Sequence, residues 1–157
     1  CCGRIVHSSY GINSRGYWLC MSETTTGLIG EYLAAAAILG LGWRVSMAQQ
    51  DRVDLVAWNG THDFIRVQAK TASLLGNKDG RSPRHHFQLG HGCKTKHLPK
   101  PSDYDVLCLV SPNARRCLFM SHPICQRSMR VSPARFTLET EIDSWAKAVD
   151  HVLEMRK

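Results

Sequence analysis

The sequence predicts an α/β sandwich in which helices flank a central mixed sheet. Apolar residues recur at helical spacing over residues 28–41, short β-branched runs follow, and a second helical pattern covers residues 139–155. This order of helix, strands and helix is typical of sheet and helix layers around one core. The chain has 157 residues, which is enough to bury such a core without disulfide bonds.

Caps at both ends support the first helix. The threonines at 24–26 offer side-chain oxygens to the free amides of a first turn, and Gly40 and Gly42 are typical of a helix stop. Four consecutive alanines at 34–37 make the helix slim. We therefore expect it to lie close on the sheet.

Strands are predicted on both sides of a long polar segment. Asn59-Gly60 is a hairpin turn signal, so the strands around it predict an antiparallel meander. Residues 74–101 are rich in Gly, Pro, Lys, Arg and His and predict a long loop, a length that is usually functional or disordered. The predicted strands cover residues 43–47, 53–58, 64–71, 104–110, 117–121 and 129–131.

The closing helix is predicted from one apolar stripe. Its members recur at helical spacing and should face the sheet. They are Ile142, Trp145, Ala146, Val149, Val152 and Leu153.

The net charge of +7 favours binding to a polyanion, and nucleic acid is the usual one. No run approaches the ~20 apolar residues of a membrane helix, and the first residues lack the pattern of a secretory signal. We expect a protein of the cytoplasm or nucleoid that is not secreted and does not contact a membrane. Residues 1–20 are treated as an N-terminal extension, tag or mobile arm to which the sequence assigns no function, and residues 21–157 as a single domain.

Four polar residues are expected to converge on one point. Gln68 and Lys70 lie two positions apart in a β-branched run, so both side chains leave the same face of a strand. Asp54 lies on the preceding strand and Glu31 on the helix. A divalent cation held by carboxylates, beside a lysine that orients or activates water, can hydrolyse a phosphodiester. The alternative makes Asp54 a turn acid at a strand end and Lys70 a solvated lysine.

The segments carrying these residues resemble the PD-(D/E)XK nuclease superfamily. VQAKTAS is similar to the VQVKT-type strand of the PD-(D/E)XK endonucleases encoded in group I introns, where glutamine also occupies the position of Gln68. Glu31 matches the helix acid that completes the site in archaeal-type Holliday junction resolvases. The resemblance extends over residues 27–136 and is strong in the first half.

The resemblance implies a restriction-endonuclease-like fold and a Mg²⁺-dependent DNA endonuclease, with Mn²⁺ as a substitute for Mg²⁺. Glu31, Asp54 and Gln68 would be metal ligands and Lys70 the catalytic lysine. Two positions depart from the family pattern: Val53 replaces the proline before Asp54, and Gln68 replaces Asp or Glu. The metal would then contact two carboxylates and a neutral amide oxygen.

Two alternatives remain open. The same site would serve a Holliday junction resolvase that acts on four-way junctions instead of linear duplex, and the neutral Gln68 is compatible with a non-catalytic nucleic-acid-binding descendant of a nuclease. Because cutting two strands is most simply done by two identical sites, we expect a homodimer or a higher symmetric oligomer.

Basic residues of the predicted loop are candidate contacts to DNA phosphates, since the loop follows the strand of Lys70. A merely solvated loop is the alternative. Asp103 and Asp105 are interpreted as structural acids at the start of a strand, and catalysis is the alternative for them. The candidate DNA contacts are Arg81, Arg84, Lys94, Lys96 and Lys100.

Overall fold

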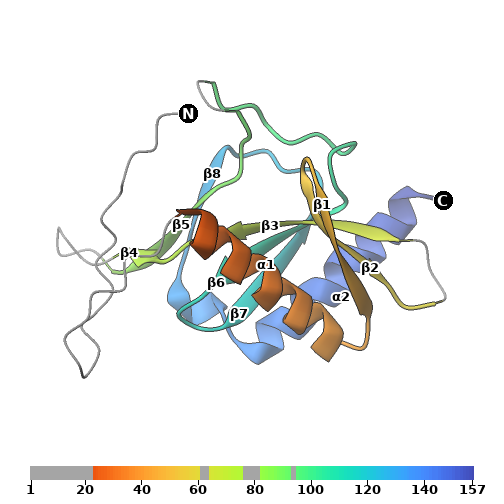
Figure 1. The fold of residues 1–157 in the computed structure, drawn as a ribbon, viewed down its shortest axis with the longest axis horizontal. Coiled ribbons are helices and arrows are strands. Elements are labelled where there is room, and N and C mark those ends of the chain that lie inside the picture. Colours follow the sequence, from red (N-terminus) through yellow and green to blue (C-terminus); the bar gives the residue numbers. More distant parts are fainter. Residues whose placement is uncertain (1–22, 61–63, 76–81, 93–94) are drawn as a thin grey trace.

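The computed structural model describes residues 23–60, 64–75, 82–92 and 95–157, so the extension predicted at 1–20 lies outside the described residues. Among these residues, the main sheet has five strands in the order β1-β2-β3-β6-β7 (Figure 1). β3 pairs in parallel with β6, whereas the other neighbours are antiparallel. The predicted mixed sheet is thus confirmed. Its strands are β1 (Arg44–Gln50), β2 (Val53–Trp58), β3 (Ile65–Thr71), β6 (Val106–Ser111) and β7 (Arg116–Ser121).

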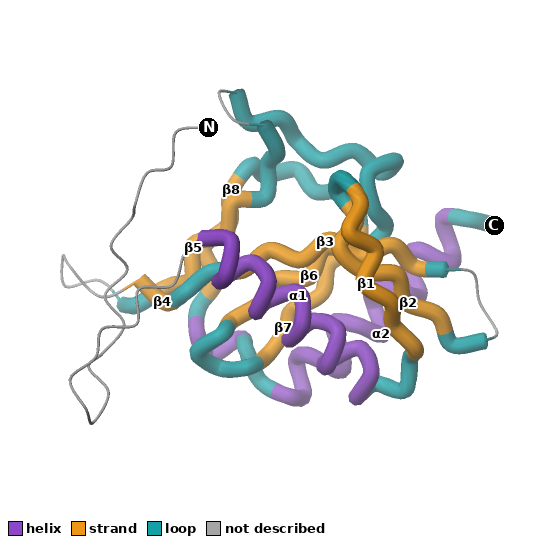
Figure 2. Tube along the Cα trace, viewed as in Figure 1, coloured by secondary structure: helices purple, strands orange, loops and turns teal. Residues whose placement is uncertain are grey.

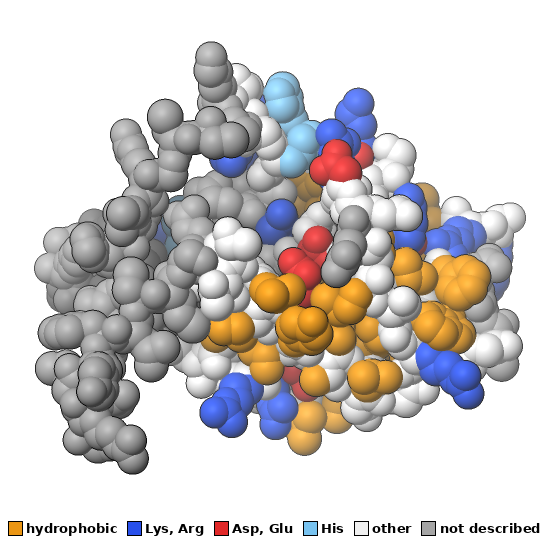
Figure 3. Space-filling view, in the orientation of Figure 1, with side chains coloured by type: hydrophobic (Ala, Val, Ile, Leu, Met, Phe, Trp, Pro, Cys, Tyr) orange, Lys and Arg blue, Asp and Glu red, His pale blue; other side chains and the backbone are white. Residues whose placement is uncertain are grey.

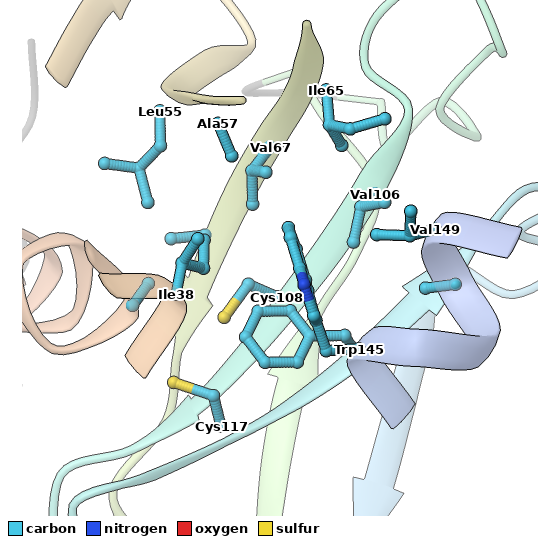
Figure 4. Packing of buried hydrophobic residues seen from close by; sticks show 14 of the residues in the cluster. Ile38, Leu55, Ala57, Ile65, Val67, Val106, Cys108, Cys117, Trp145 and Val149 are labelled. Carbon is cyan, nitrogen blue, oxygen red and sulfur yellow. The ribbon is translucent and has the colours of Figure 1, made fainter. Parts of the chain in front are cut away.

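Both long helices contribute to one core on one face of this sheet. α1 (Glu23–Gly40) and α2 (Leu138–Met155) lie near the ends of the chain. Figure 4 shows Ile38 from α1 and Trp145 from α2 approaching the same strands from two sides, with Cys108 between them. Trp145 also packs edge-on against Trp43, with ring centroids 5.3 Å apart.

A second, smaller sheet covers the other face. It contains β4 (Leu74–Leu75), β5 (Arg84–Gln88) and β8 (Ser128–Val131), in the order β4-β5-β8 (Figure 2). Alternation along β6 turns Cys108 toward the helices, whereas Leu107 and Leu109 join a second core with Phe87. β6 is therefore buried on both faces, which explains its unbroken apolar sequence. The short 3₁₀ helix η1 (Pro133–Arg135) precedes α2.

The prediction of one continuous loop over residues 74–101 is wrong. β4 and β5 lie within this segment, and His85, Phe87 and Leu89 are buried. His85 donates a hydrogen bond through Nδ1 to the carbonyl of Ala72 at 2.8 Å, and its Nε2 lies 3.1 Å from the hydroxyl of Ser111. Apolar residues in a polar, glycine-rich context carry little periodic signal, so the local sequence concealed these strands.

The predicted stripe of α2 is partly wrong. Ile142 and Ala146 are exposed, and Glu141 is buried instead. Glu141 accepts a 2.6 Å hydrogen bond from the backbone N–H of Cys117, and the hydroxyl of Ser144 accepts one from Phe119 at 3.1 Å. β7 is an edge strand, so its outward N–H groups need acceptors, and this requirement turns a carboxylate inward.

No helix among the described residues is long and apolar enough to cross a membrane.

Candidate nuclease site

Two neighbouring strands position Asp54 and Gln68 opposite one another. Leu55 of β2 pairs with Val67 of β3. Because the two strands are antiparallel, Asp54, which precedes Leu55, lies opposite Gln68, which follows Val67. The side-chain amide nitrogen of Gln68 donates a hydrogen bond to Oδ2 of Asp54, and the backbone N–H of Ala69 donates to the same oxygen at 2.7 Å. The carboxylate of Asp54 is therefore fixed against β3.

Glu31 reaches this site from α1. Burial raises the pKa of Glu31, and the nearby carboxylate of Asp54 raises it further. Burial also raises the pKa of Asp54, although the hydrogen bond from Ala69 and the charge of Lys70 oppose that rise. Two carboxylates held this close resist ionising together, which a bound cation would relieve.

Lys70 completes the group. Burial lowers the pKa of its ammonium, the Asp54 carboxylate opposes this effect, and the charge of Lys96 adds to it. The structure thus places Glu31, Gln68 and Lys70 around Asp54, and the roles assigned to these four residues stay a prediction. Lys70 is no ordinary solvated lysine, because its surroundings favour the neutral amine more than water does.

The donor set fits a hard divalent cation with few charged ligands. Glu31 and Asp54 supply carboxylate oxygens, which Mg²⁺ and Mn²⁺ prefer. Gln68 could supply an oxygen only after a half-turn of its amide, because its nitrogen now faces Asp54. Within the described part of the chain, no group of three or more His, Cys, Asp and Glu could hold a metal ion, so any ion here depends on these two acids and neutral donors.

The candidate DNA contacts are only partly described. Arg84 is exposed on β5, and Lys96 and Lys100 are exposed in the segment that follows. Arg81 and Lys94 lie outside the described residues. Among the three described residues, Lys96 comes near enough to Lys70 to lower its pKa.

A short backbone bridge holds the segment that carries Lys96. The N–H of His91 donates to the carbonyl of His97 at 3.1 Å, and the N–H of His97 donates back at 2.9 Å. Gly90 packs where a Cβ would lie 2.9 Å from the carbonyl oxygen of His97, so a side chain there would disturb the bridge. Lys96 therefore directly precedes a residue of this bridge and lies near Lys70.

Asp103 and Asp105 have the structural role that was predicted. Asp105 accepts hydrogen bonds from the backbone N–H of Arg66 at 2.7 Å and from the guanidinium of Arg156 at 2.9 Å. Asp103 pairs with Arg52 at 2.6 Å. These arginine partners hold the pKa of Asp105 below its usual range despite its burial. Both acids tie the start of β6 to the β1–β2 turn, β3 and the end of α2.

Sequence reasoning did not assign a role to Gly30, one residue before Glu31. A Cβ there would overlap Oγ1 of Thr71 and lie 2.9 Å from its Cβ, so the absence of a side chain lets α1 touch the end of β3. The sequence signal for such a contact was a glycine inside a helical pattern. A glycine there lowers helix stability, so its presence indicates that the helix packs closely against a neighbour.

Comparisons with known proteins agree with this architecture. No family model and no curated protein sequence matches the chain. Among solved structures, the chain is similar to the bacterial homing endonuclease I-Ssp6803I, with a TM-score of 0.65 over 87% of this chain and 99% of that chain. The chain has a nuclease-like α/β fold. The sequence identity is 13%, so the likeness shows the fold alone.

Proposed function

We propose that the protein is a metal-dependent DNA endonuclease that hydrolyses phosphodiester bonds. The observation that carries this proposal is the grouping of Glu31 and Asp54 with Gln68 and the half-buried Lys70. The structural likeness to a homing endonuclease supports it. The resemblance of the sequence to the PD-(D/E)XK superfamily is a further reason for it.

The chain's own residues divide the chemistry between them. Glu31, Asp54 and Gln68 would hold Mg²⁺, or Mn²⁺ in its place, and the ion supplies positive charge for the phosphate oxygens and the leaving oxygen. Ala69 keeps Asp54 oriented through the 2.7 Å hydrogen bond from its N–H. Lys70, whose pKa burial lowers below the usual lysine value, can accept a proton at Nζ from the attacking water once it is neutral.

Charge indicates which residues would contact DNA, and symmetry indicates how many copies of the chain would act together. Arg84, Lys96 and Lys100, together with Arg81 and Lys94, would contact DNA phosphates, in keeping with the net charge of +7. A homodimer would present two sites to the two strands of a duplex. Such an enzyme would work in the cytoplasm or on the nucleoid.

One observation favours a second candidate function. Gln68 brings no negative charge and directs its amide nitrogen at Asp54, which suits a nucleic-acid-binding protein that has lost cleavage. A Holliday junction resolvase would use the same four residues, so it differs from the main proposal only in the shape of its DNA.

The deciding experiment incubates the protein with supercoiled plasmid, linear duplex and a four-way junction, each with Mg²⁺, Mn²⁺ or EDTA. We expect cleavage with either ion, none in EDTA, and a loss of cleavage in Asp54→Asn. Asp51→Asn is the matched control, because that carboxylate is 97% exposed and only three positions away. Undiminished cleavage in EDTA contradicts the metal. Binding without cleavage supports the second candidate, and a preference for the junction identifies a resolvase.

A further inference from the structure

The solvent side of α1 is apolar. Leu28, Tyr32 and Leu39 are 46%, 60% and 54% exposed, and Ala36 is exposed between them. Figure 3 shows hydrophobic side chains gathered over α1, with both acidic and basic side chains at the margin of the patch. The opposite side of the helix is buried through Ala34 and Ile38, so apart from Glu31 and the polar first turn α1 carries apolar side chains on both its buried and its exposed side. A helix of this kind is normally covered on both sides.

The exposed residues form one continuous stripe. The exposed positions 28, 32, 36 and 39, together with the half-buried Ala35, follow the spacing of neighbours on one helix face and carry no charged side chain. The chain contains 20 Lys and Arg and 13 Asp and Glu, so an uncharged helix face in contact with solvent requires an explanation. An exposed apolar patch of this kind marks an interaction surface.

We propose that a second copy of this chain covers the stripe, with the two α1 helices antiparallel about a two-fold axis. The order of residues along the stripe is self-complementary about a centre between Leu33 and Ala34. An axis at that centre sets Leu28 against the partner's Leu39 and Tyr32 against the partner's Ala35. Each large side chain at the inner pair meets a small one, and each end pairs leucine with leucine, as an isologous interface requires.

Charge selects the same surface. Two copies that each carry +7 repel one another wherever their basic regions meet, and a nucleic acid has no charge to pair with on the stripe. An uncharged apolar face is where like-charged copies can approach. Ala35 and Ala36 at its middle leave room for two helices to pack closely.

The interface would also couple the two sites in space. Glu31 lies beside Tyr32 on α1, within two turns of the axis, so both helices would bring their acids to the same region. The inference deepens the homodimer of the proposed function by naming its surface. Its test does not use cleavage, so a failed nuclease assay and a failed dimer remain distinguishable.

The test is sedimentation equilibrium of the full chain and its variants. We expect a wild-type dimer, and Leu28→Lys or Leu39→Glu alone should weaken dimerisation at least about tenfold, because each buries a charge against leucine. The double variant Leu28→Lys with Leu39→Glu places opposite charges against each other across the axis twice. It should recover most of the affinity, although the two positions are too far apart on one helix to pair within a chain.

Ile142→Lys is the matched control, because Ile142 is 49% exposed on α2 and lies outside the stripe. It should leave the dimer intact. Circular dichroism checks that every variant remains folded. A wild-type monomer at tens of micromolar, a dimer that is insensitive to both single variants, or a double variant no tighter than the singles would overturn the proposal.

Discussion

Gly30 and Thr71 touch where α1 crosses the end of β3, and no side chain fits between them. A Cβ on Gly30 would overlap the hydroxyl of Thr71 and lie 2.9 Å from its Cβ. Glu31 follows Gly30 and Lys70 precedes Thr71, so this contact sets the distance between the helix acid and the lysine strand.

Gly30→Ala should therefore separate the two halves of the site. Overpacking at such a contact costs about 1–3 kcal/mol of unfolding free energy, and cleavage should fall more than stability alone explains. Gly27→Ala is the control, because a Cβ at Gly27 meets nothing within 4 Å in the same helix. It should stabilise the helix by up to about 1 kcal/mol with normal cleavage. Denaturant unfolding and single-turnover rates measure both effects, and equal behaviour of the two variants would refute the role of Gly30.

The pKa of Lys70 should govern the pH dependence of cleavage. Burial lowers this pKa, Asp54 opposes the shift and Lys96 strengthens it. If neutral Lys70 accepts the proton, the cleavage rate should rise with pH as Lys70 loses its proton, and this rise should occur below the usual pKa of a lysine. Lys96→Met removes a positive charge, so the pKa of Lys70 increases and the rise in rate moves to higher pH. Lys100→Met is the control. Measuring kcat against pH for both variants shows whether only Lys96→Met moves the rise in rate to higher pH. Lys70→Ala should lower cleavage by about 10²–10⁴-fold.

The same shift makes a prediction about stability. Because folding lowers the pKa of Lys70, the unfolded chain binds more protons between the lowered pKa and the usual one. The contribution of Lys70 to unfolding free energy therefore rises with pH through that window. The difference in unfolding free energy between wild type and Lys70→Met, measured by denaturant unfolding across alkaline pH, isolates the contribution of Lys70. A difference that does not change with pH would show that Lys70 keeps its ordinary pKa.

The basic segment around Lys96 should supply DNA affinity. Neutralising Lys94, Lys96 and Lys100 together should weaken binding and reduce the salt dependence by up to about three counterions. Folding should persist, since the segment is anchored by the buried Phe87 and Leu89 and not by its lysines. Neutralising the exposed Lys147 and Lys157 of the C-terminal region is the control. An unchanged salt slope in the first variant would show that the segment only connects strands.

Gln68 is one of two positions at which the sequence departs from the PD-(D/E)XK pattern that it resembles. Gln68→Glu adds a charge beside Asp54 and removes the N–H donor that Asp54 now accepts, so the metal-free protein should melt lower. Metal should bind more tightly to this variant and restore its melting temperature. Gln68→Ala should reduce cleavage and weaken metal binding. Gln88→Glu, on an exposed position of β5, is the control. No change in the Mg²⁺ concentration for half-maximal cleavage in either Gln68 variant would place Gln68 outside the metal site.

Local pattern in the sequence determined the elements that carry the site. Alternation along residues 64–71 predicts that Gln68 and Lys70 share a face, and the Asn59-Gly60 turn predicts that β2 lies beside β3. These rules depend on neighbours in the chain, so one sequence suffices to apply them. The same reasoning gave the mixed sheet and the structural role of Asp103 and Asp105.

Only the tertiary structure decided where distant groups satisfy one another. β5 forms because it pairs with the distant β8, and β4 pairs in turn with β5, although the short sequences of β4 and β5 have no period of their own. Glu141 faces inward because an edge strand needs an acceptor, which a helical stripe of apolar residues cannot reveal. A hydrogen bond to Asp54 orients the side-chain amide of Gln68. Burial and the charge of Lys96 lower the pKa of Lys70. Hydrogen bonding and desolvation depend on what packs against a residue, and that is a property of the folded chain.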